Sequence, residues 1–285
     1  MITREVEATA VADLAYAPPR ASLATTVENE ILLLPISLTL EDPTDPGFSP
    51  RVLLVPKDCP DLAGQSVVVV ADDGPQWFRL RSLTVRGTAV AMGGGSYRLV
   101  PRRVVAWDYG SLRPAPAPPE SGRPQQPDFS VVDRNDVQPV SSSELEAALA
   151  ASRVMIIATR SPKGTPFAVP LWFVAHHGSI WATTGASSWT VRNVVASPDV
   201  AILLGGENRN DTRMLVRGRA RAVPGIPPAA VLARIAWRYY LDPPFAAVEL
   251  INMRLWCRRV RYYAQSKGAQ VIVIPQSAAE CLAPQ

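Results

Sequence analysis

Two long stretches of the chain alternate short apolar runs with turn residues, a pattern that is typical of β-strands. In the first stretch the apolar runs occupy residues 30–40, 51–55, 65–71, 77–92 and 96–107. Turn residues bound them, notably Asp72–Pro75 and three consecutive glycines at 93–95. Because these glycines lie between two strand-like runs with no helix after them, we expect a hairpin turn and not a phosphate-binding loop.

The second stretch opens with a predicted helix over 141–152, where Ser143 and Glu146 form a capping box. Strands are predicted at 153–160, 166–175, 179–184, 200–204, 213–223 and 253–265. A short helix is expected within 187–196, and a second helix over 227–241, between Pro227-Pro228 and Asp242-Pro243.

Prolines crowd residues 113–130, which favours an extended linker between the two stretches. We therefore divide the chain at this linker. The predicted parts are a loosely ordered N-terminus (1–26), a first β-rich domain (27–112), the linker (113–140), a second β-rich domain (141–275) and a tail (276–285).

The two stretches resemble each other. Residues 83–92 and 214–223 share Val-Arg-Gly-x-Ala, and residues 97–111 and 253–267 share Arg-Leu-x-x-Arg-Arg-Val. Residues 49–55 and 197–203 can also be paired. Matches in the same order indicate a duplicated domain. The first copy is a reduced one, since it has no counterpart of the 185–193 loop or of the 227–241 helix.

Composition narrows the class of protein. With 47% hydrophobic residues the chain can bury real cores. No apolar run is long enough for a signal peptide or a membrane span, and three scattered cysteines (Cys59, Cys257, Cys281) argue against a disulfide framework. We expect a cytoplasmic protein with no membrane partner.

The charge is split between the halves. Residues 1–140 hold 13 Lys and Arg against 17 Asp and Glu, net −4, and residues 141–285 hold 16 against 8, net +8, which sum to the +4 of the chain. An anionic ligand on the basic half or attraction between the halves explains this split. Nucleic acid is the least favoured partner, because no basic run is interleaved with aromatic residues.

Few residues suggest chemistry by themselves. Ser187, Ser188 and Thr190 precede or open the short helix, where they either cap it or meet an anion. His176 and His177 are adjacent, so on a regular strand they point to opposite faces and do not chelate one metal ion. We expect them to be solvated at a turn, and only a single haem ligand stays open. No catalytic acid, base or nucleophile is assigned.

Several motifs in order resemble the flavin-binding split β-barrel family related to pyridoxamine 5′-phosphate oxidase. They are Ala158-Thr159, Gly164, Pro170–Phe173, Trp181–Thr184, the loop-helix at 187–196, Val200–Leu204 and Val216–Ala220. The resemblance covers about residues 141–267, and more faintly 28–113. It implies a mainly β fold with a few helices, in which two split β-barrel domains in tandem form an intramolecular pseudo-dimer with one cofactor groove.

The resemblance implies an FMN-dependent oxidoreductase acting on a small organic substrate. Two alternatives stay open: a reductase that uses the deazaflavin coenzyme F-420, and a non-catalytic binding or scaffold protein. Haem binding is less favoured than either. Beyond the fused pair, a further homo-oligomer is possible.

The resemblance also implies a set of cofactor-binding residues. They are Val169, Pro170, Leu171, Trp172, Thr183, Thr184, Ser187, Ser188, Trp189, Thr190, Arg192 and Asn193, together with Arg103 and Trp107 from the first copy. Family members commonly carry Lys or Arg-Lys where this chain has Trp189 and Thr190. Arg192 is the residue expected to replace that cation on a phosphate. Arg213 and Arg217 are further candidates for an anionic tail, or are simply solvated.

Overall fold

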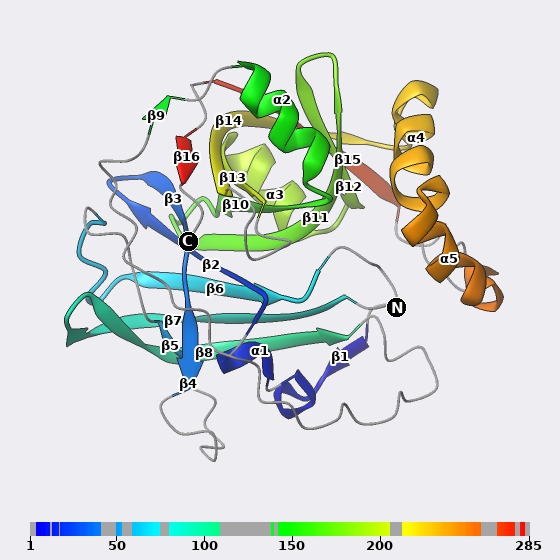
Figure 1. Ribbon diagram of the computed structural model, residues 1–285. Helices are drawn as coiled ribbons and strands as arrows, with labels where there is room; N and C mark the ends of the chain where they lie inside the picture. The colour runs from blue at the N-terminus through cyan, green and yellow to red at the C-terminus, as the bar shows by residue number, and fades with distance from the viewer. Residues whose placement is uncertain are drawn as a thin grey trace.

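A computed structural model of the chain describes residues 4–11, 13–16, 18–40, 50–52, 59–74, 80–108, 138–139, 142–205, 213–257, 267–276 and 280–282. Two β-sheets lie one above the other, the N-terminal sheet below and the C-terminal sheet above in Figure 1. The larger helices lie on the outside of the C-terminal sheet, and α4 and α5 extend to one side of it.

The N-terminal sheet is antiparallel, with the strand order β3-β2-β6-β7-β8-β5-β4 and β1 paired with β8. Its strands are β1 (Arg4–Val6), β2 (Arg20–Val27), β3 (Glu30–Pro35), β4 (Leu38–Leu40), β5 (Pro50–Val52), β6 (Ser66–Asp72), β7 (Arg81–Gly93) and β8 (Ser96–Asp108). A 3-10 turn, η1 (Ala8–Val11), and a helical turn, α1 (Asp13–Tyr16), precede β2. The sheet surrounds a core of its own, which includes Leu14, Leu23, Leu62 and Val85.

The C-terminal sheet is a six-stranded barrel. Its order is β13-β10-β11-β12-β15-β14, and it closes because β13 also pairs with β14. Its strands are β10 (Val154–Arg160), β11 (Pro166–His176), β12 (Ser179–Gly185), β13 (Asp199–Leu204), β14 (Arg213–Pro224) and β15 (Gly268–Pro275). Two short strands, β16 (Glu280–Leu282) and β9 (Gln138–Pro139), extend the sheet from β14.

Helices occupy the connections of the barrel. They are α2 (Ser142–Ala151), α3 (Trp189–Ala196), α4 (Ala229–Ala236), the π-helical turn η4 (Trp237–Leu241), α5 (Pro243–Ile251) and the 3-10 turn η5 (Met253–Leu255). Pro228 precedes α4, and Pro243 begins α5, where a missing N–H costs nothing. In the described part of the chain no helix is both long and apolar enough to cross a membrane.

The two sheets repeat one strand framework. Residues that face one another across three neighbouring strands match in both: Ala24, Val68 and Arg86 in the N-terminal sheet, and Ala158, Ala201 and Arg217 in the barrel. Strands β2, β3, β6, β7 and β8 therefore correspond to β10, β11, β13, β14 and β15. The duplication expected from the sequence is present in the strand pairing itself.

One glycine in each copy follows the matched arginine and has the same structural reason. Gly87 faces Pro101 of β8, and Gly218 faces Pro275 of β15. A Cβ atom on Gly218 would lie 2.6 Å from the carbonyl oxygen of Ile274, and one on Gly87 would lie closer still to that of Val100. Only glycine allows the next strand to approach so closely.

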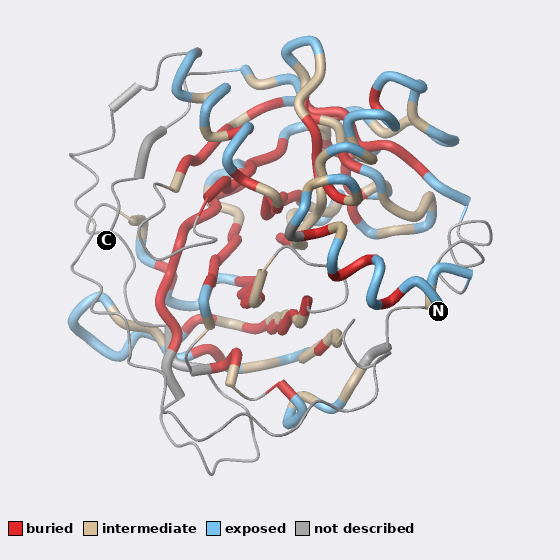
Figure 2. The backbone as a smooth tube through the Cα atoms, turned by 45° about the vertical axis from the view of Figure 1, so that its right-hand side comes forward, coloured by how far each residue is buried: buried red, intermediate tan, exposed pale blue. Residues whose placement is uncertain are grey.

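The sheets pack face to face through matched strands. β11 lies against β6, and β13 lies against β3, so each contact is repeated with the roles of the copies exchanged. A buried apolar cluster spans the interface: Ala24, Ile31, Leu33, Val68, Val70, Ile156, Ala158, Ala168, Ala201, Leu203 and Leu215. In Figure 2 the buried segments, drawn in red, occur in both sheets and at the interface between them. The two copies form the expected intramolecular pseudo-dimer.

A buried ion pair distinguishes the N-terminal sheet from the barrel. Arg20 on β2 donates from Nε to Asp72 Oδ2 on β6 at 3.0 Å, and both residues are buried. Burial, and then the nearby Arg20, lowers the pKa of Arg213 on β14, so an arginine of the barrel lies close to this ion pair. The matched barrel positions are Val154 and Gly205, where no such pair is possible.

The segment α4–η4–α5 covers the outer face of β11 and β12. Its buried contacts are made by Val231, Tyr239 and Phe245, which pack on Val174. The hydroxyl of Tyr239 accepts from the Phe173 N–H at 2.9 Å and lies 2.7 Å from the Phe173 carbonyl oxygen. The pairing of β11 with β10 ends at Trp172. Tyr239 therefore takes the place of a strand partner for the backbone of Phe173 on that side of β11.

Two sequence expectations about element positions were wrong. The N-terminal residues 1–26 were expected to be loosely ordered, yet β2 is an interior strand of the sheet and Val11 and Leu14 are fully buried. The strand expected at 253–265 is helical over the part described, from Met253 to Cys257, and the strand β15 follows it instead. The apolar run at 271–273, which is buried in the barrel, had been overlooked.

These differences also correct the repeat. The match between 97–111 and 253–267 is wrong, because β8 corresponds to β15, and Pro101 and Pro275 hold equivalent positions opposite Gly87 and Gly218. The match between 49–55 and 197–203 is wrong as well, since β6 and not β5 corresponds to β13. The match of the two Val-Arg-Gly motifs is confirmed, and so is the hairpin turn at residues 93–95.

The domain boundaries themselves stay predictions. Most of the predicted linker lies outside the described residues, and so does most of the predicted tail. The parts that are described, β9 and β16, pair with one another and so join the end of the linker to the tail.

Candidate functional site

Strand β11 presents alternate residues to two different surroundings. The side chains of Val169 and Leu171 pack on the barrel core, whereas Pro170 and Trp172 belong to the outer face. The Trp172 ring stacks on Tyr239 at 4.4 Å between centroids, with 5° between the planes. Only backbone groups at 169 and 171 can meet a ligand outside the barrel, and the Trp172 ring is already stacked.

The two threonines at the end of β12 differ in exposure. Thr183 is exposed and faces Gln270 of β15, and Thr184 is half-buried and faces Ala269. Both lie just before the loop that leads into α3, so the strand brings two hydroxyls to the same end of the barrel as Ser187.

The loop and first turn of α3 contain both structural and available groups. Ser188 is the N-cap, and its Oγ accepts from the Val191 N–H at 3.3 Å. Ser187 and Arg192 are exposed, and the Arg192 guanidinium lies 5.2 Å from the centre of the Trp189 ring, which is 53% exposed. These groups can contact an anion without rearrangement of the helix.

Thr190 and Asn193, in contrast, are buried on the inner side of α3. Asn193 donates from Nδ2 to Thr159 Oγ1 of β10 at 3.0 Å, both side chains being buried. This hydrogen bond fixes α3 on the end of the barrel. Asn193 thus holds the helix on the barrel, and Thr190 is buried on the same side of it.

Arg103 and Trp107 lie on β8, on the face of the N-terminal sheet that is opposite to its own core. Arg103 faces Arg86 of β7 across the strand pair, and Trp107 faces Ser82. Neighbouring side chains of that face, such as Val68 and Val70, are buried in the interface with the barrel. The N-terminal sheet therefore directs these residues toward the side on which the barrel lies.

Arg86 is a candidate that the sequence reasoning missed. Its guanidinium carbon lies 4.5 Å from the centre of the Phe167 ring of β11, so it reaches from one copy to the other. Burial, and then the neighbouring Arg103, lowers the pKa of Arg86, and its Nε is buried with no hydrogen-bond partner among the described residues. The repeated Val-Arg-Gly motif was the available signal.

The matched arginine of the barrel is neutralised. Arg217 pairs with Glu30 of β3 at 3.1 Å, whereas Arg86 faces a second arginine. Phe167 under Arg86 pairs with Thr159 of β10, and Thr159 accepts the hydrogen bond from α3. The unneutralised arginine thus lies at the end of the barrel that α3 closes.

The histidines lie at the β11–β12 hairpin, as expected, with His177 exposed and His176 half-buried. His177 is in a two-residue turn with a φ of +48°, which ends the alternation of the strand. The rings of His176 and His177 consequently lie 4.0 Å apart, centre to centre, and line one cleft. The described residues contain no group of three or more His, Cys, Asp or Glu side chains placed to hold a metal ion.

Comparison with known proteins finds one family model that matches part of the chain. The family model of pyridoxamine 5′-phosphate oxidase matches residues 141–265, which cover the barrel up to the segment before β15. A comparison with curated proteins finds no match.

Solved structures resemble about half of the chain. A Listeria innocua protein named for pyridoxamine 5′-phosphate oxidase is 14% identical, with a TM-score of 0.34, over 49% of this chain and 96% of that one. An FAD-binding protein from Mesorhizobium loti is 18% identical, with a TM-score of 0.35, over 51% and 95%. The haem storage protein HutZ from Vibrio cholerae is 15% identical, with a TM-score of 0.36, over 48% and 92%. These likenesses are too distant to identify a ligand.

Proposed function

Since residues 141–265 match the family model of pyridoxamine 5′-phosphate oxidase, we propose that this protein is an FMN-dependent oxidoreductase acting on a small organic substrate. The observation that supports the proposal is the packing of β11 against β6 in one chain. By resemblance, the family places its cofactor in the groove between two subunits, and the interface between the two copies is the corresponding region of this chain. A bound flavin supplies the hydride-transfer chemistry, and the protein supplies position and charge.

The groups at the start of α3 fit a phosphate. The Ser187 hydroxyl, the free N–H groups of the first helical turn and the Arg192 guanidinium all belong to one exposed loop and helix start. Arg192 takes the role of the missing lysine, with the added ability to bind two phosphate oxygens at once.

Arg86 and Arg103 fit the same proposal from the N-terminal copy. Two guanidinium groups that face each other across a strand pair repel one another, and an anion between them relieves that repulsion. The buried Nε of Arg86 without a partner is the orphaned donor that such an anion would satisfy. Because Arg217 is paired with Glu30, Arg86 is the one of these two matched arginines that has no carboxylate partner among the described residues, which supports a single cofactor site.

The same arginines favour a second candidate, a reductase that uses the deazaflavin coenzyme F-420. Its anionic tail is longer than the single phosphate of FMN and needs cations beyond the start of α3. Arg86 and Arg103 offer them on the neighbouring copy.

The test is a titration of the purified full-length protein with FMN, with the deazaflavin and with haemin, followed by absorption and fluorescence. We expect a flavin or deazaflavin band that changes on binding. Arg192→Glu should abolish binding, and Arg86→Ala should weaken it about tenfold, which corresponds to about 1.4 kcal/mol. Arg217→Ala is the matched control, because it removes the corresponding arginine of the other copy, and it should leave the affinity unchanged.

Two outcomes would overturn the oxidoreductase proposal. Binding of neither flavin nor deazaflavin would leave a barrel kept for what it holds or touches, as a scaffold. A Soret band with haemin alone would move the site to the histidines. Equal losses in Arg86→Ala and Arg217→Ala would contradict the placement of the cofactor in the groove beside Arg86.

A further inference from the structure

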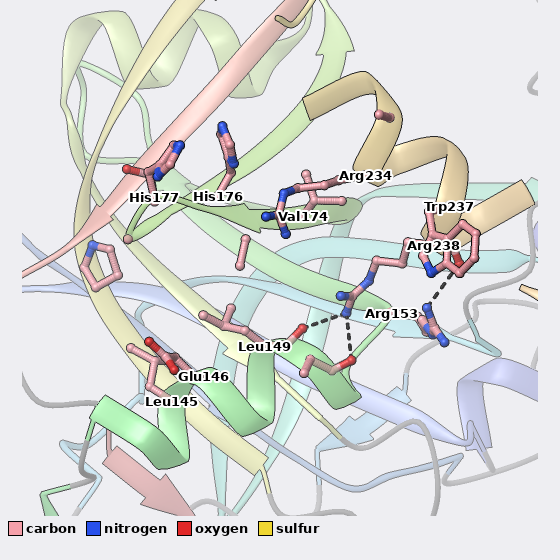
Figure 3. A pocket seen from close by; sticks show the side chains of 16 residues that line it. Leu145, Glu146, Leu149, Arg153, Val174, His176, His177, Arg234, Trp237 and Arg238 are labelled. Carbon is pink, nitrogen blue, oxygen red and sulfur yellow. Dashed lines mark hydrogen bonds between the residues drawn. The ribbon is translucent and has the colours of Figure 1, made fainter. Parts of the chain in front are cut away.

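A second site lies on the barrel away from the proposed cofactor groove. It is a cleft of about 1030 Å³ between α2, the β11–β12 hairpin and the segment α4–η4 (Figure 3). Along β11 its lining begins at Val174, whereas Ala168 is buried in the interface with the N-terminal sheet. Six residue steps separate Ala168 from Val174, about 20 Å at about 3.3 Å per step. Trp172, on which Tyr239 stacks, lies between these two positions along the strand.

The walls of the cleft are largely apolar. Leu145 and Leu149 of α2 form one side, and Val174 of β11 and Trp237 of η4 contribute to the other (Figure 3). Trp237 is 73% exposed, which is unusual for so large an apolar ring in a monomer. An apolar ligand in the cleft would remove part of this ring from water, and this is a favourable contribution to binding.

One cation in the cleft is left without a partner. Arg153 pairs with Asp242 at 2.9 Å, and Arg238 donates to the carbonyl oxygens of Leu149, Ala150 and Ser152 at the end of α2. Arg234 of α4 makes no hydrogen bond or ion pair with a described residue, and its side chain extends into the view of Figure 3 beside Val174. The acidic side chain that lines the cleft, Glu146, projects from α2 on the other side of the opening.

A neutral polar group lies beside Arg234. The Nδ1 atom of His176 is buried and has no partner among the described residues. Burial, together with His177 and Arg234, lowers the pKa of His176 and so favours the uncharged form of its imidazole. An unpaired buried nitrogen of this kind costs free energy unless a ligand satisfies it.

The backbone of β11 adds another unpaired group. His176 and Ser179 flank the two-residue turn and are hydrogen-bonded to each other in such a hairpin, so Ala175 directs its N–H and C=O away from β12. The same alternation explains why the N–H and C=O of Phe173 meet Tyr239. Ala175 lines the cleft, and in the described part of the chain nothing binds its backbone from that side.

We propose that this cleft binds an amphipathic monoanion, an aromatic carboxylate in the first instance. The ring packs between Leu149 and Val174 under Trp237, and the carboxylate pairs with Arg234. The Ala175 N–H and the His176 imidazole provide neutral hydrogen bonds. The site is independent of the proposed cofactor, so it can be tested whether or not a flavin binds.

The experiment is calorimetric titration of the full-length protein with two probes of nearly equal size, 2-naphthoate and 2-naphthalenemethanol. We expect naphthoate to bind at least tenfold more tightly than the alcohol. Arg234→Ala should lower the affinity for naphthoate to that for the alcohol and leave the affinity for the alcohol unchanged. Arg234→Lys should restore part of the difference between the two affinities. Arg219→Ala, which removes an exposed arginine on β14 outside the cleft, is the matched control and should change neither probe.

Location is read from the fluorescence of Trp237. Naphthoate should change the tryptophan emission of the native protein, and Trp237→Phe should remove most of that change. Equal affinities for the two probes, the absence of binding at millimolar concentration, or equal losses in Arg234→Ala and Arg219→Ala would each overturn the proposal. Thermal unfolding of every variant shows whether it is folded, and the exposed position of Arg234 makes its replacement mild.

Discussion

The N-terminal sheet and the barrel repeat one framework and differ in what connects its last two strands. In the N-terminal copy β7 turns directly into β8 through Gly94 and Gly95. In the barrel, residues 225–267 separate β14 from β15, and their described part contains α4, η4 and α5. The pairing beyond this connection is the same, with Gly87 opposite Pro101 and Gly218 opposite Pro275. The comparison teaches that the strand framework tolerates a long insertion at a hairpin, and that this insertion builds a second surface.

The copies also differ in how they treat charge. The matched arginines Arg86 and Arg217 each reach toward the other copy, but only Arg217 finds a carboxylate. The N-terminal copy has kept the unneutralised arginine, and the barrel has kept α3. Each copy therefore retains half of the proposed anion site.

The largest effect is expected from replacing the matched glycines, which tests whether the two copies share the same close approach of strands. Gly87→Ala and Gly218→Ala each place a methyl group against a backbone carbonyl, so we expect each to lower the free energy of unfolding by about 3 kcal/mol or more. Gly87→Ala should be the worse of the two, because the approach to Val100 is closer than that to Ile274. Denaturant unfolding measures both, and a loss below about 1 kcal/mol in either would contradict the shared close approach.

A second test uses the ion pair that only the N-terminal copy has. Asp72→Asn leaves the buried Arg20 without its counter-charge, so we expect a loss of about 3 kcal/mol. The double variant Arg20→Val, Asp72→Ala removes both charges and should recover most of that loss. Glu30→Gln, which breaks an exposed pair with Arg217, should cost less than about 1 kcal/mol. If the double variant is no better than Asp72→Asn, the cost lies in packing and not in the uncompensated charge.

A third test compares two tyrosines that bind backbone groups, one in each copy. Tyr239→Phe leaves the Phe173 N–H unsatisfied, and we expect a loss of about 1–2 kcal/mol and faster hydrogen exchange in α4 and α5. Tyr97→Phe is the counterpart in the N-terminal sheet, where the hydroxyl accepts a longer bond, 3.3 Å, from the Leu62 N–H. Its effect should be smaller, and an equal effect would show that Tyr239 is not what holds the inserted helices.

The smallest expected effect is a pH dependence specific to the barrel. The pKa of His176 is lowered in the folded state, so below about pH 6.5 the unfolded chain binds more protons than the folded one. The contribution of His176 to the free energy of unfolding is therefore present above that pH and is lost as the pH falls. We expect His176→Gln to flatten this part of the stability profile, and an NMR titration of His176 to give a midpoint below that of an unfolded peptide. An unchanged profile would contradict the assignment.

Much of the fold was readable from the chain because strands and turns have local signals. The Val-Arg-Gly motif, the alternation along β11 and the proline pair before α4 predicted the right elements. The segment 253–265 failed because its valine, leucine and tyrosine residues look strand-like, whereas the part described is helical. The apolar run at 271–274 has only four residues, and its place as a barrel strand depends on the pairing to β14 and β12.

The candidate site was predictable only in part. The residues implied by resemblance lie along β11, β12 and α3, but sequence does not say which side of a helix faces the barrel. Asn193 holds α3 in place, Thr190 is buried beside it, and Trp172 stacks on Tyr239, which is 67 positions away along the chain. Arg86 was missed because the sequence does not show which of the matched arginines pairs with a carboxylate of the other copy. The packing of the two sheets shows that Arg217 does, with Glu30.

The fusion of the two copies has a consequence for assembly and for evolution. A groove between separate subunits exists only above the dissociation constant of the dimer, whereas here its two walls are joined covalently and meet at a fixed effective concentration. Ligand affinity in this groove should not depend on how dilute the protein is. A mutation in a homodimer also changes both grooves at once, whereas here it changes one. The chain was therefore free to pair Arg217 with Glu30 while leaving Arg86 open, an asymmetry that two identical subunits cannot encode.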